Sequence, residues 1–211
     1  MLASLADAAR RLKRGSRQGS RGARLPACIL IADSGRLADP GAAIAALPRG
    51  SAVILRDYDV ADRMARAARL SRLCRRRRLH LLVAGDARLA VAVGAQGLHL
   101  PEGLARSADR RWRLWRKPGW LVTAAAHSPR AIALARRAGV DAVLLSPVFP
   151  TASHPGAATL GPVLFAAWTR KAPLPVYALG GMTAATTRRL SGSGAAGIAA
   201  IGGFAASSAR R

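Results

Sequence analysis

The chain alternates short apolar runs with longer segments of helical spacing. Eight runs recur along it, and each ends in a polar or glycine-bearing segment. Uninterrupted apolar runs of this length are typical of parallel strands buried on both faces. The eight runs are Ala27–Ala32, Ala52–Leu55, Leu79–Ala84, Gly97–Leu100, Leu121–Ala126, Ala142–Ser146, Val176–Leu179 and Gly197–Ile201.

The segments between the runs have the spacing of amphipathic helices. Pro129–Ala138 is one, and Gly139 stands where a helix C-cap is expected. Val60–Arg77 is another, with arginines on a second face. Its predicted apolar face consists of Val60, Met64, Ala67, Leu70 and Cys74.

Strands that alternate with helices predict parallel pairing through right-handed crossovers, and eight such units favour a (β/α)8 TIM barrel. An open doubly wound sheet is the alternative. Residues 1–14 predict a further, N-terminal helix with Leu2, Leu5, Ala9 and Leu12 on one face. After Gly203 the chain is too short for a full eighth helix, so the N-terminal helix can cover part of that gap. We expect residues 1–24 to form a basic helix and flexible linker, and residues 25–211 to form the barrel.

The net charge of +24 comes almost entirely from arginine. A basic surface attracts nucleic acid, but the arginines are spread over most predicted helices and aromatic residues make up only 4% of the chain. We therefore do not expect nucleic acid as a partner. The sequence leaves the oligomeric state open, a homo-oligomer included.

Cys28 and Cys74 are too few and too far apart for a metal quartet or a disulfide framework. No run approaches the roughly 18 apolar residues of a membrane span, and no cleavage site follows the first helix. A reduced, cytoplasmic protein without a membrane partner is expected.

Two strand exits carry adjacent glycines, Gly180-Gly181 and Gly202-Gly203. In barrels of this class the loops after strands seven and eight commonly bind phosphate, because glycines let backbone N–H groups approach an anion. We predict a phosphate site there, although glycines also serve simply as tight turns.

Other strand exits carry titratable side chains. His127 follows the fifth run and suits proton transfer near neutral pH. Asp86 and Glu102 are weak candidates for a magnesium site, and helix capping is their alternative role. Arg56 can clamp a phosphate or pair with a carboxylate. The polar loop after the sixth run offers three further substrate-binding candidates, which are Thr151, Ser153 and His154.

Three of these exits together resemble the thiamine phosphate synthase/TenI family. They are SPVFPT at Ser146–Thr151, ALGGM at Ala178–Met182 and GSGAAGIAAIGGF at Gly192–Phe204, and weaker matches extend the resemblance over about residues 27–204. The resemblance implies a (β/α)8 barrel in thiamine biosynthesis. The synthase joins a hydroxymethylpyrimidine pyrophosphate to a thiazole phosphate with Mg²⁺, whereas TenI-type members include a metal-independent thiazole tautomerase.

Carried over by position, the paired glycines would hold the thiazole phosphate. Arg56, Thr151 and Ser153 would lie near the pyrophosphate, and Asp86 would bind metal. The chain departs from the synthase pattern at several of the polar positions. These departures are Ile54 for Gln, Tyr58 for Lys, Gly85 for Asn, Ala125 for Ser and His154 for Lys.

Because the glycines and His127 are retained, we interpret the chain as TenI-like: it binds a phosphorylated thiazole, with His127 as the acid/base of a tautomerase that needs no cofactor. A divergent Mg²⁺-dependent synthase and a non-catalytic binder of phosphorylated ligands are the alternatives.

Overall fold

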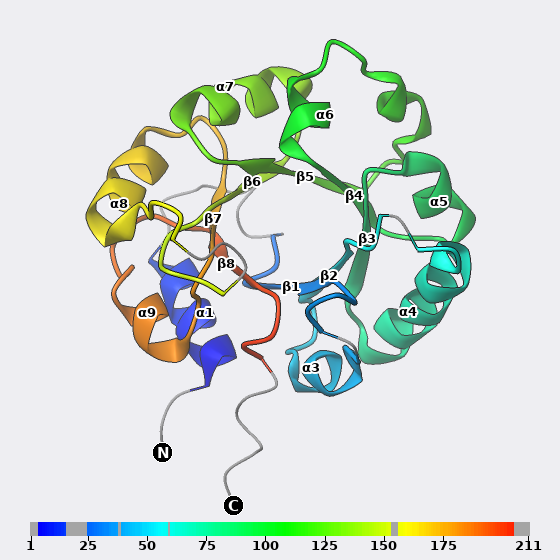
Figure 1. The fold of residues 1–211 in the computed structure, drawn as a ribbon, viewed down its shortest axis with the longest axis horizontal. Coiled ribbons are helices and arrows are strands. Elements are labelled where there is room, and N and C mark those ends of the chain that lie inside the picture. The colour runs from blue at the N-terminus through cyan, green and yellow to red at the C-terminus, as the bar shows by residue number, and fades with distance from the viewer. Residues whose placement is uncertain (1–3, 16–24, 38, 59, 153–155, 205–211) are drawn as a thin grey trace, which may run out of the picture.

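Eight parallel strands close into a barrel in a computed structural model of the chain, which describes residues 4–15, 25–37, 39–58, 60–152 and 156–204 (Figure 1). The strands are β1 (Cys28–Ala32), β2 (Ala52–Leu55), β3 (His80–Ala84), β4 (Gly97–Leu100), β5 (Leu121–Ala126), β6 (Ala142–Leu145), β7 (Val176–Leu179) and β8 (Gly197–Ala200). Strand β1 pairs with both β2 and β8. The structure therefore confirms the predicted TIM barrel and excludes the alternative of an open sheet.

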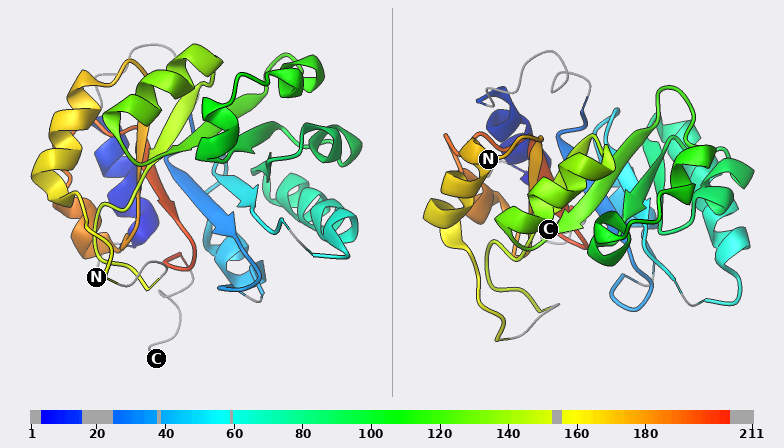
Figure 2. Two further views of the ribbon diagram at one scale, coloured as in Figure 1. Left: turned by 45° about the horizontal axis from the view of Figure 1, so that its top comes forward. Right: turned by 90° about the horizontal axis from the view of Figure 1, so that it is seen from above.

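Helices surround the barrel, and the two side views of Figure 2 show them packed against the outside of the strands. They are α1 (Leu5–Arg14), α3 (Gly41–Ala46), α4 (Arg63–Arg77), α5 (Ala87–Ala92), α6 (Glu102–Arg106), α7 (Pro129–Ala138), α8 (Gly161–Lys171) and α9 (Ala184–Arg188), with a 3₁₀ helix η1 (Arg111–Trp115). Helix α7 has the predicted bounds, and Gly139 caps it in the left-handed conformation.

One prediction for α4 is wrong. The helix begins at Arg63 instead of Val60, and Met64 is 55% exposed instead of facing the core. Arg63 donates a hydrogen bond to the carbonyl of Ala84, the last residue of β3. The first turn of α4 thus lies level with the end of the strand, where Met64 has no sheet to pack against.

Helix α1 occupies the position of an eighth barrel helix, between α9 and the β8–β1 pair (Figure 1). Leu5 lies beside the loop after β8, and Lys13 donates a hydrogen bond to the Leu25 carbonyl just before β1. The helix therefore runs antiparallel to the strands, as the other barrel helices do. Residues 16–24, predicted as a flexible linker, and residues 205–211 lie outside the described ranges.

Side chains alternate along the strands between two apolar layers. Those facing outward pack under the helices, and those facing inward fill the barrel with residues such as Ile29, Ile54 and Leu144. Tyr177 is fully buried in this interior and donates its hydroxyl to the Pro26 carbonyl at 2.7 Å. The interior is thus a packed core that leaves the functional groups to the strand ends.

Both cysteines are free and buried, and burial raises the pKa of each thiol to about 12. Within the described ranges, no helix has the length and apolar character required to cross a bilayer.

Candidate functional site

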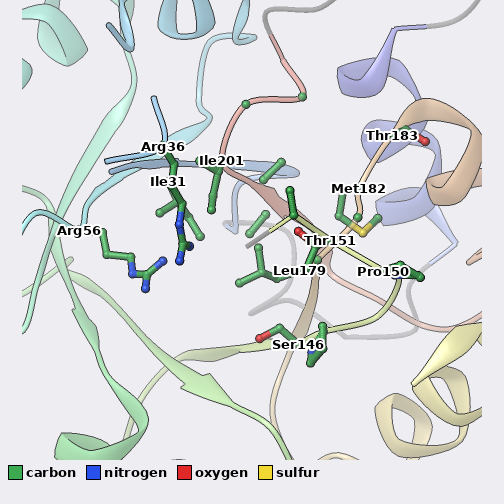
Figure 3. A pocket seen from close by; sticks show the side chains of 18 residues that line it. Ile31, Arg36, Arg56, Ser146, Pro150, Thr151, Leu179, Met182, Thr183 and Ile201 are labelled. Atoms are coloured by element: carbon green, nitrogen blue, oxygen red, sulfur yellow. The ribbon is translucent and has the colours of Figure 1, made fainter. Parts of the chain in front are cut away.

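A pocket of about 300 Å³ opens at the carboxyl ends of the strands, among the loops that follow β1, β2, β6, β7 and β8. Figure 3 shows Arg56 on one side of it and Thr151, Pro150 and Met182 on the other. The four predicted phosphate-binding glycines all line it. The glycine exits after β7 and β8 therefore converge on one cavity with the exits after β2 and β6.

The loop after β7 needs glycine for both conformation and space. Gly180 and Gly181 have φ values of 99° and 62°, in the left-handed region that disfavours side chains. A Cβ on Gly181 would lie 2.5 Å from the Pro150 carbonyl oxygen, and one on Gly180 would lie 3.0 Å from the Pro147 Cα. Close packing between the β6 and β7 loops therefore depends on these glycines.

Backbone hydrogen bonds hold the same two loops together. The Val148 N–H donates to the Leu179 carbonyl at 2.9 Å, and the Phe149 N–H donates to the Gly180 carbonyl at 3.2 Å. The β6 loop is thus an extension of the sheet at this point, which fixes one wall of the pocket.

The two glycines after β8 differ from each other. A Cβ on Gly202 would meet no atom within 4 Å, so its surroundings leave room for a ligand. A Cβ on Gly203 would lie 2.8 Å from Leu5 of α1 and 3.0 Å from the Met182 carbonyl oxygen. Helix α1 therefore packs directly on the β8 loop and supports it from outside.

Two guanidinium groups line the pocket wall formed by the β1 and β2 loops. The Nη1 atom of Arg56 lies 3.3 Å from an oxygen of Asp33, and that of Arg36 lies 4.0 Å from the same oxygen. Two cations thus share one carboxylate, which leaves net positive charge on this wall. Arg36 was not among the residues that the sequence singled out, because its turn after β1 carries no recognisable motif.

The polar loop after β6 contributes Ser146 and Thr151 to the lining. Ser146 was not predicted as a site residue individually. The predicted candidates Ser153 and His154 lie outside the described residues.

His127 is not among the residues that line the pocket. Its Nδ1 atom lies 2.6 Å from Oε2 of Glu102, the first residue of α6. The other carboxylate oxygen of Glu102 lies 3.3 Å from Arg106. The structure therefore brings two predicted site residues together in a histidine–carboxylate pair, outside the pocket that the glycines line.

A family model described as thiamine monophosphate synthase matches residues 28–204. The chain is 38% identical over 161 residues to a thiamine-phosphate synthase of Thiobacillus denitrificans, covering 74% of this chain and 75% of that protein. It is 36% identical over 155 residues to a putative thiamine-phosphate synthase 2 of Aquifex aeolicus, covering 72% and 81%. The chain belongs to the thiamine monophosphate synthase family.

A solved structure agrees with this thiamine monophosphate synthase fold. The thiamine phosphate pyrophosphorylase from Pyrococcus furiosus superposes with a TM-score of 0.69 at 21% identity, over 89% of this chain and 90% of that one. At this identity the likeness concerns the fold.

Two of the departures from the synthase pattern occupy one corner of the molecule. The Tyr58 ring lies 3.3 Å from the position that a Cβ on Gly85 would take, and the Arg63 guanidinium lies 5.8 Å from the centre of the same ring. Burial raises the pKa of Tyr58, although the nearby Arg56 and Arg63 act in the opposite direction. A side chain at position 85 would displace this ring, so the two departures are structurally coupled.

Asp86 has partners of its own in this synthase-family chain. One carboxylate oxygen accepts a hydrogen bond from the Leu89 N–H at 2.9 Å and caps α5, and the other lies 3.6 Å from Nη1 of Arg63. Across the described part of the chain, no group of three or more His, Cys, Asp or Glu residues could hold a metal ion. With Arg63 beside Asp86, the Leu89 cap on its other oxygen and glycine at position 85, the residues present do not fit the magnesium site of the synthase pattern.

A further polar pair lies inside the barrel. Nδ1 of His99 lies 2.9 Å from the Thr123 hydroxyl, and burial lowers the pKa of His99 to about 4. The sequence located His99 at a strand exit, but only the barrel closure shows that its imidazole faces a neighbouring threonine inside.

Proposed function

We propose that this chain forms thiamine phosphate from a pyrimidine pyrophosphate and a thiazole phosphate, as the names of its relatives suggest. The observation that carries the proposal is the pocket itself, which has two walls suited to anions. The glycine loops after β7 and β8 form one, and Arg36 and Arg56 form the other. A reaction that joins two phosphorylated molecules requires such an arrangement, and a single-substrate isomerase does not.

The physical basis differs between the two walls. Backbone N–H groups of glycine-rich loops bind a phosphate at a fixed position without a mobile side chain. Guanidinium groups bind phosphate oxygens in pairs and carry full charge at neutral pH. The glycine wall therefore suits the thiazole phosphate, and the arginine wall suits the pyrophosphate, which leaves when the two rings are joined.

The test is to incubate the purified chain with both substrates, with and without Mg²⁺, and to follow thiamine phosphate by chromatography. We expect product that depends on both substrates and on enzyme concentration. Binding of the thiazole phosphate without product under either condition would contradict the proposal and favour a non-catalytic binding protein.

A thiazole tautomerase is the second candidate, and the His127–Glu102 pair is the observation that favours it. A carboxylate oxygen 2.6 Å from Nδ1 fixes the orientation of the imidazole, as a general base requires. The same protein sample can be tested with the thiazole phosphate carboxylate tautomer. Isomerisation by the wild type that His127→Ala abolishes would establish this activity instead.

Substitutions at Leu5 and Leu12 test whether α1 positions the β8 loop or only stabilises the barrel. Leu5 and Leu12 are both buried on α1, at 6% and 7% exposure, but only Leu5 touches Gly203. We expect Leu5→Ala and Leu12→Ala each to lower the free energy of unfolding by about 2 to 3 kcal/mol. Leu5→Ala should also raise the Kd for thiazole phosphate by roughly five- to tenfold, because the loop loses its support.

Calorimetric titration of both variants, alongside urea unfolding, separates the two effects. Equal Kd values for Leu5→Ala and Leu12→Ala would show that α1 stabilises the barrel without positioning the phosphate loop.

A further inference from the structure

Arg63 occupies the corner where the synthase pattern would bind a divalent cation. Its Nη1 atom lies 3.6 Å from Asp86, and its Nη2 atom donates to the Ala84 carbonyl. The side chain is only 17% exposed, and within the described residues its buried Nε atom has no hydrogen-bond partner. The guanidinium is therefore fixed at the end of β3.

Tyr58 connects this corner to the pocket. The Arg63 guanidinium lies 5.8 Å from the centre of its ring, and Arg56, two residues before Tyr58, lines the pocket. The ring also fills the space left by Gly85. Tyrosine, glycine and arginine thus form one packed unit that extends from the pocket to Asp86.

In this unit the positive charge of Arg63 compensates the negative charge of Asp86. Asp86 follows β3, so it lies at the same end of the barrel as the pocket, and without a partner its charge would repel a diphosphate, whose charge has the same sign. A bound cation removes that repulsion in a metal enzyme, and an arginine at the same carboxylate removes it permanently. Since the capping bond to Leu89 uses the other oxygen of Asp86, both oxygens are already engaged.

We propose that Arg63 supplies, as a fixed cation, the positive charge beside Asp86 that a divalent cation supplies in the synthase pattern, so that a diphosphate binds this pocket without metal. Arg36 and Arg56 make the direct contacts, and Arg63 acts through Asp86 as a positioning residue. The inference rests on the proposed function for the identity of the diphosphate. The probe is therefore inorganic pyrophosphate, whose binding succeeds or fails independently of catalysis.

The experiment is calorimetric titration with pyrophosphate, in EDTA and in millimolar MgCl₂. For the wild type we expect the Kd in EDTA and in Mg²⁺ to agree within about threefold. Arg63→Met should raise the Kd in EDTA by about tenfold, because it exposes the charge of Asp86. The double variant Arg63→Met/Asp86→Asn should return it to within about threefold of the wild type. Asparagine caps helices as well as aspartate does, so α5 is preserved.

Arg72→Met is the matched control. Arg72 lies on the same helix, is exposed to solvent and does not line the pocket. It should leave the Kd within about twofold of the wild type. Arg63→Lys keeps the charge and should retain binding even if Arg63→Met is poorly folded.

Four results would each overturn the proposal. They are a wild-type affinity that rises tenfold or more with Mg²⁺, an Arg63→Met variant that binds like the wild type, failure of Asp86→Asn to restore binding in the double variant, and an equal loss in Arg72→Met. Loss of binding in Arg63→Lys to the level of Arg63→Met would also count against it. If pyrophosphate binds as expected but the chain forms no thiamine phosphate, only the proposed function is contradicted.

Discussion

Gly181→Ala is expected to raise the Kd for thiazole phosphate by roughly 100-fold or more, the largest effect of any single substitution in the pocket. The new Cβ would lie 2.5 Å from the Pro150 carbonyl oxygen and 2.7 Å from the Phe149 Cβ, at a φ of 62°. The left-handed conformation alone costs an alanine about 1 to 2 kcal/mol, and the overlap with backbone adds to that. The β6 and β7 loops must therefore separate, which displaces the β7 side of the proposed phosphate site.

Gly192→Ala is the control for this substitution. Gly192 has a φ of 74°, but a Cβ there would meet no atom within 4 Å. It carries the same conformational cost without the overlap, and it does not line the pocket. We expect about 1 kcal/mol lower stability and an unchanged Kd. Calorimetry on both variants, after circular dichroism has shown each to be folded, decides the matter. A Gly181→Ala variant that binds within about threefold of the wild type would contradict the assignment of this loop.

The second large effect is a pH dependence of stability that originates at His99. Burial lowers its pKa to about 4 in the folded chain, whereas an unfolded chain binds a proton near the ordinary value of 6.5. As the pH falls through this interval, the unfolded state takes up a proton that the folded state does not. Stability is therefore complete above the unfolded pKa and is lost as the pH falls towards the folded one. The expected loss between pH 7.5 and pH 5 is about 2 kcal/mol.

Urea unfolding at both pH values measures this loss. His99→Gln removes the titrating group and should flatten the dependence, since an amide can still bond to the Thr123 hydroxyl. His80→Gln changes an exposed histidine and should leave the dependence unchanged. Equal stability of the wild type at the two pH values would show that the His99 imidazole takes up a proton as readily in the folded chain as in the unfolded chain.

The strand positions were readable from the sequence because parallel strands are buried on both faces. The bounds of β2, β4, β5 and β7 agree with the apolar runs, and β3 is one residue shorter than predicted. Helix bounds were less certain where no cap marked them. Ser128 and Gly139 delimit α7, whereas α4 has no side-chain cap at its start and begins three residues later than expected.

The place of α1 needed the three-dimensional structure. Its amphipathic pattern predicted a helix that covers part of the gap after β8, and the structure confirms this position, but the sequence could not show which residues meet there. Only the contact of Leu5 with Gly203 shows that this helix supports the β8 loop, where we propose the phosphate site.

The candidate site was predicted only in part, because ion pairs join residues from different strands. Glycine pairs at strand exits have a recognisable signature, so the glycine wall of the pocket could be foreseen. The pairs Asp33–Arg56, Glu102–His127 and Asp86–Arg63 depend on how neighbouring strand exits are aligned. The sequence shows that positions 58 and 85 both depart from the synthase pattern. It does not show that the two residues lie in contact, because they belong to different strand exits.

The measurement that tests the central claim most directly is a calorimetric comparison of thiazole phosphate with the same thiazole alcohol lacking its phosphate. If the loops after β7 and β8 bind the phosphate, the phosphorylated compound should bind with one site per chain. The alcohol should bind at least roughly 100-fold more weakly, because charge-assisted hydrogen bonds to the phosphate are lost. Equal affinities for the two compounds would contradict the account.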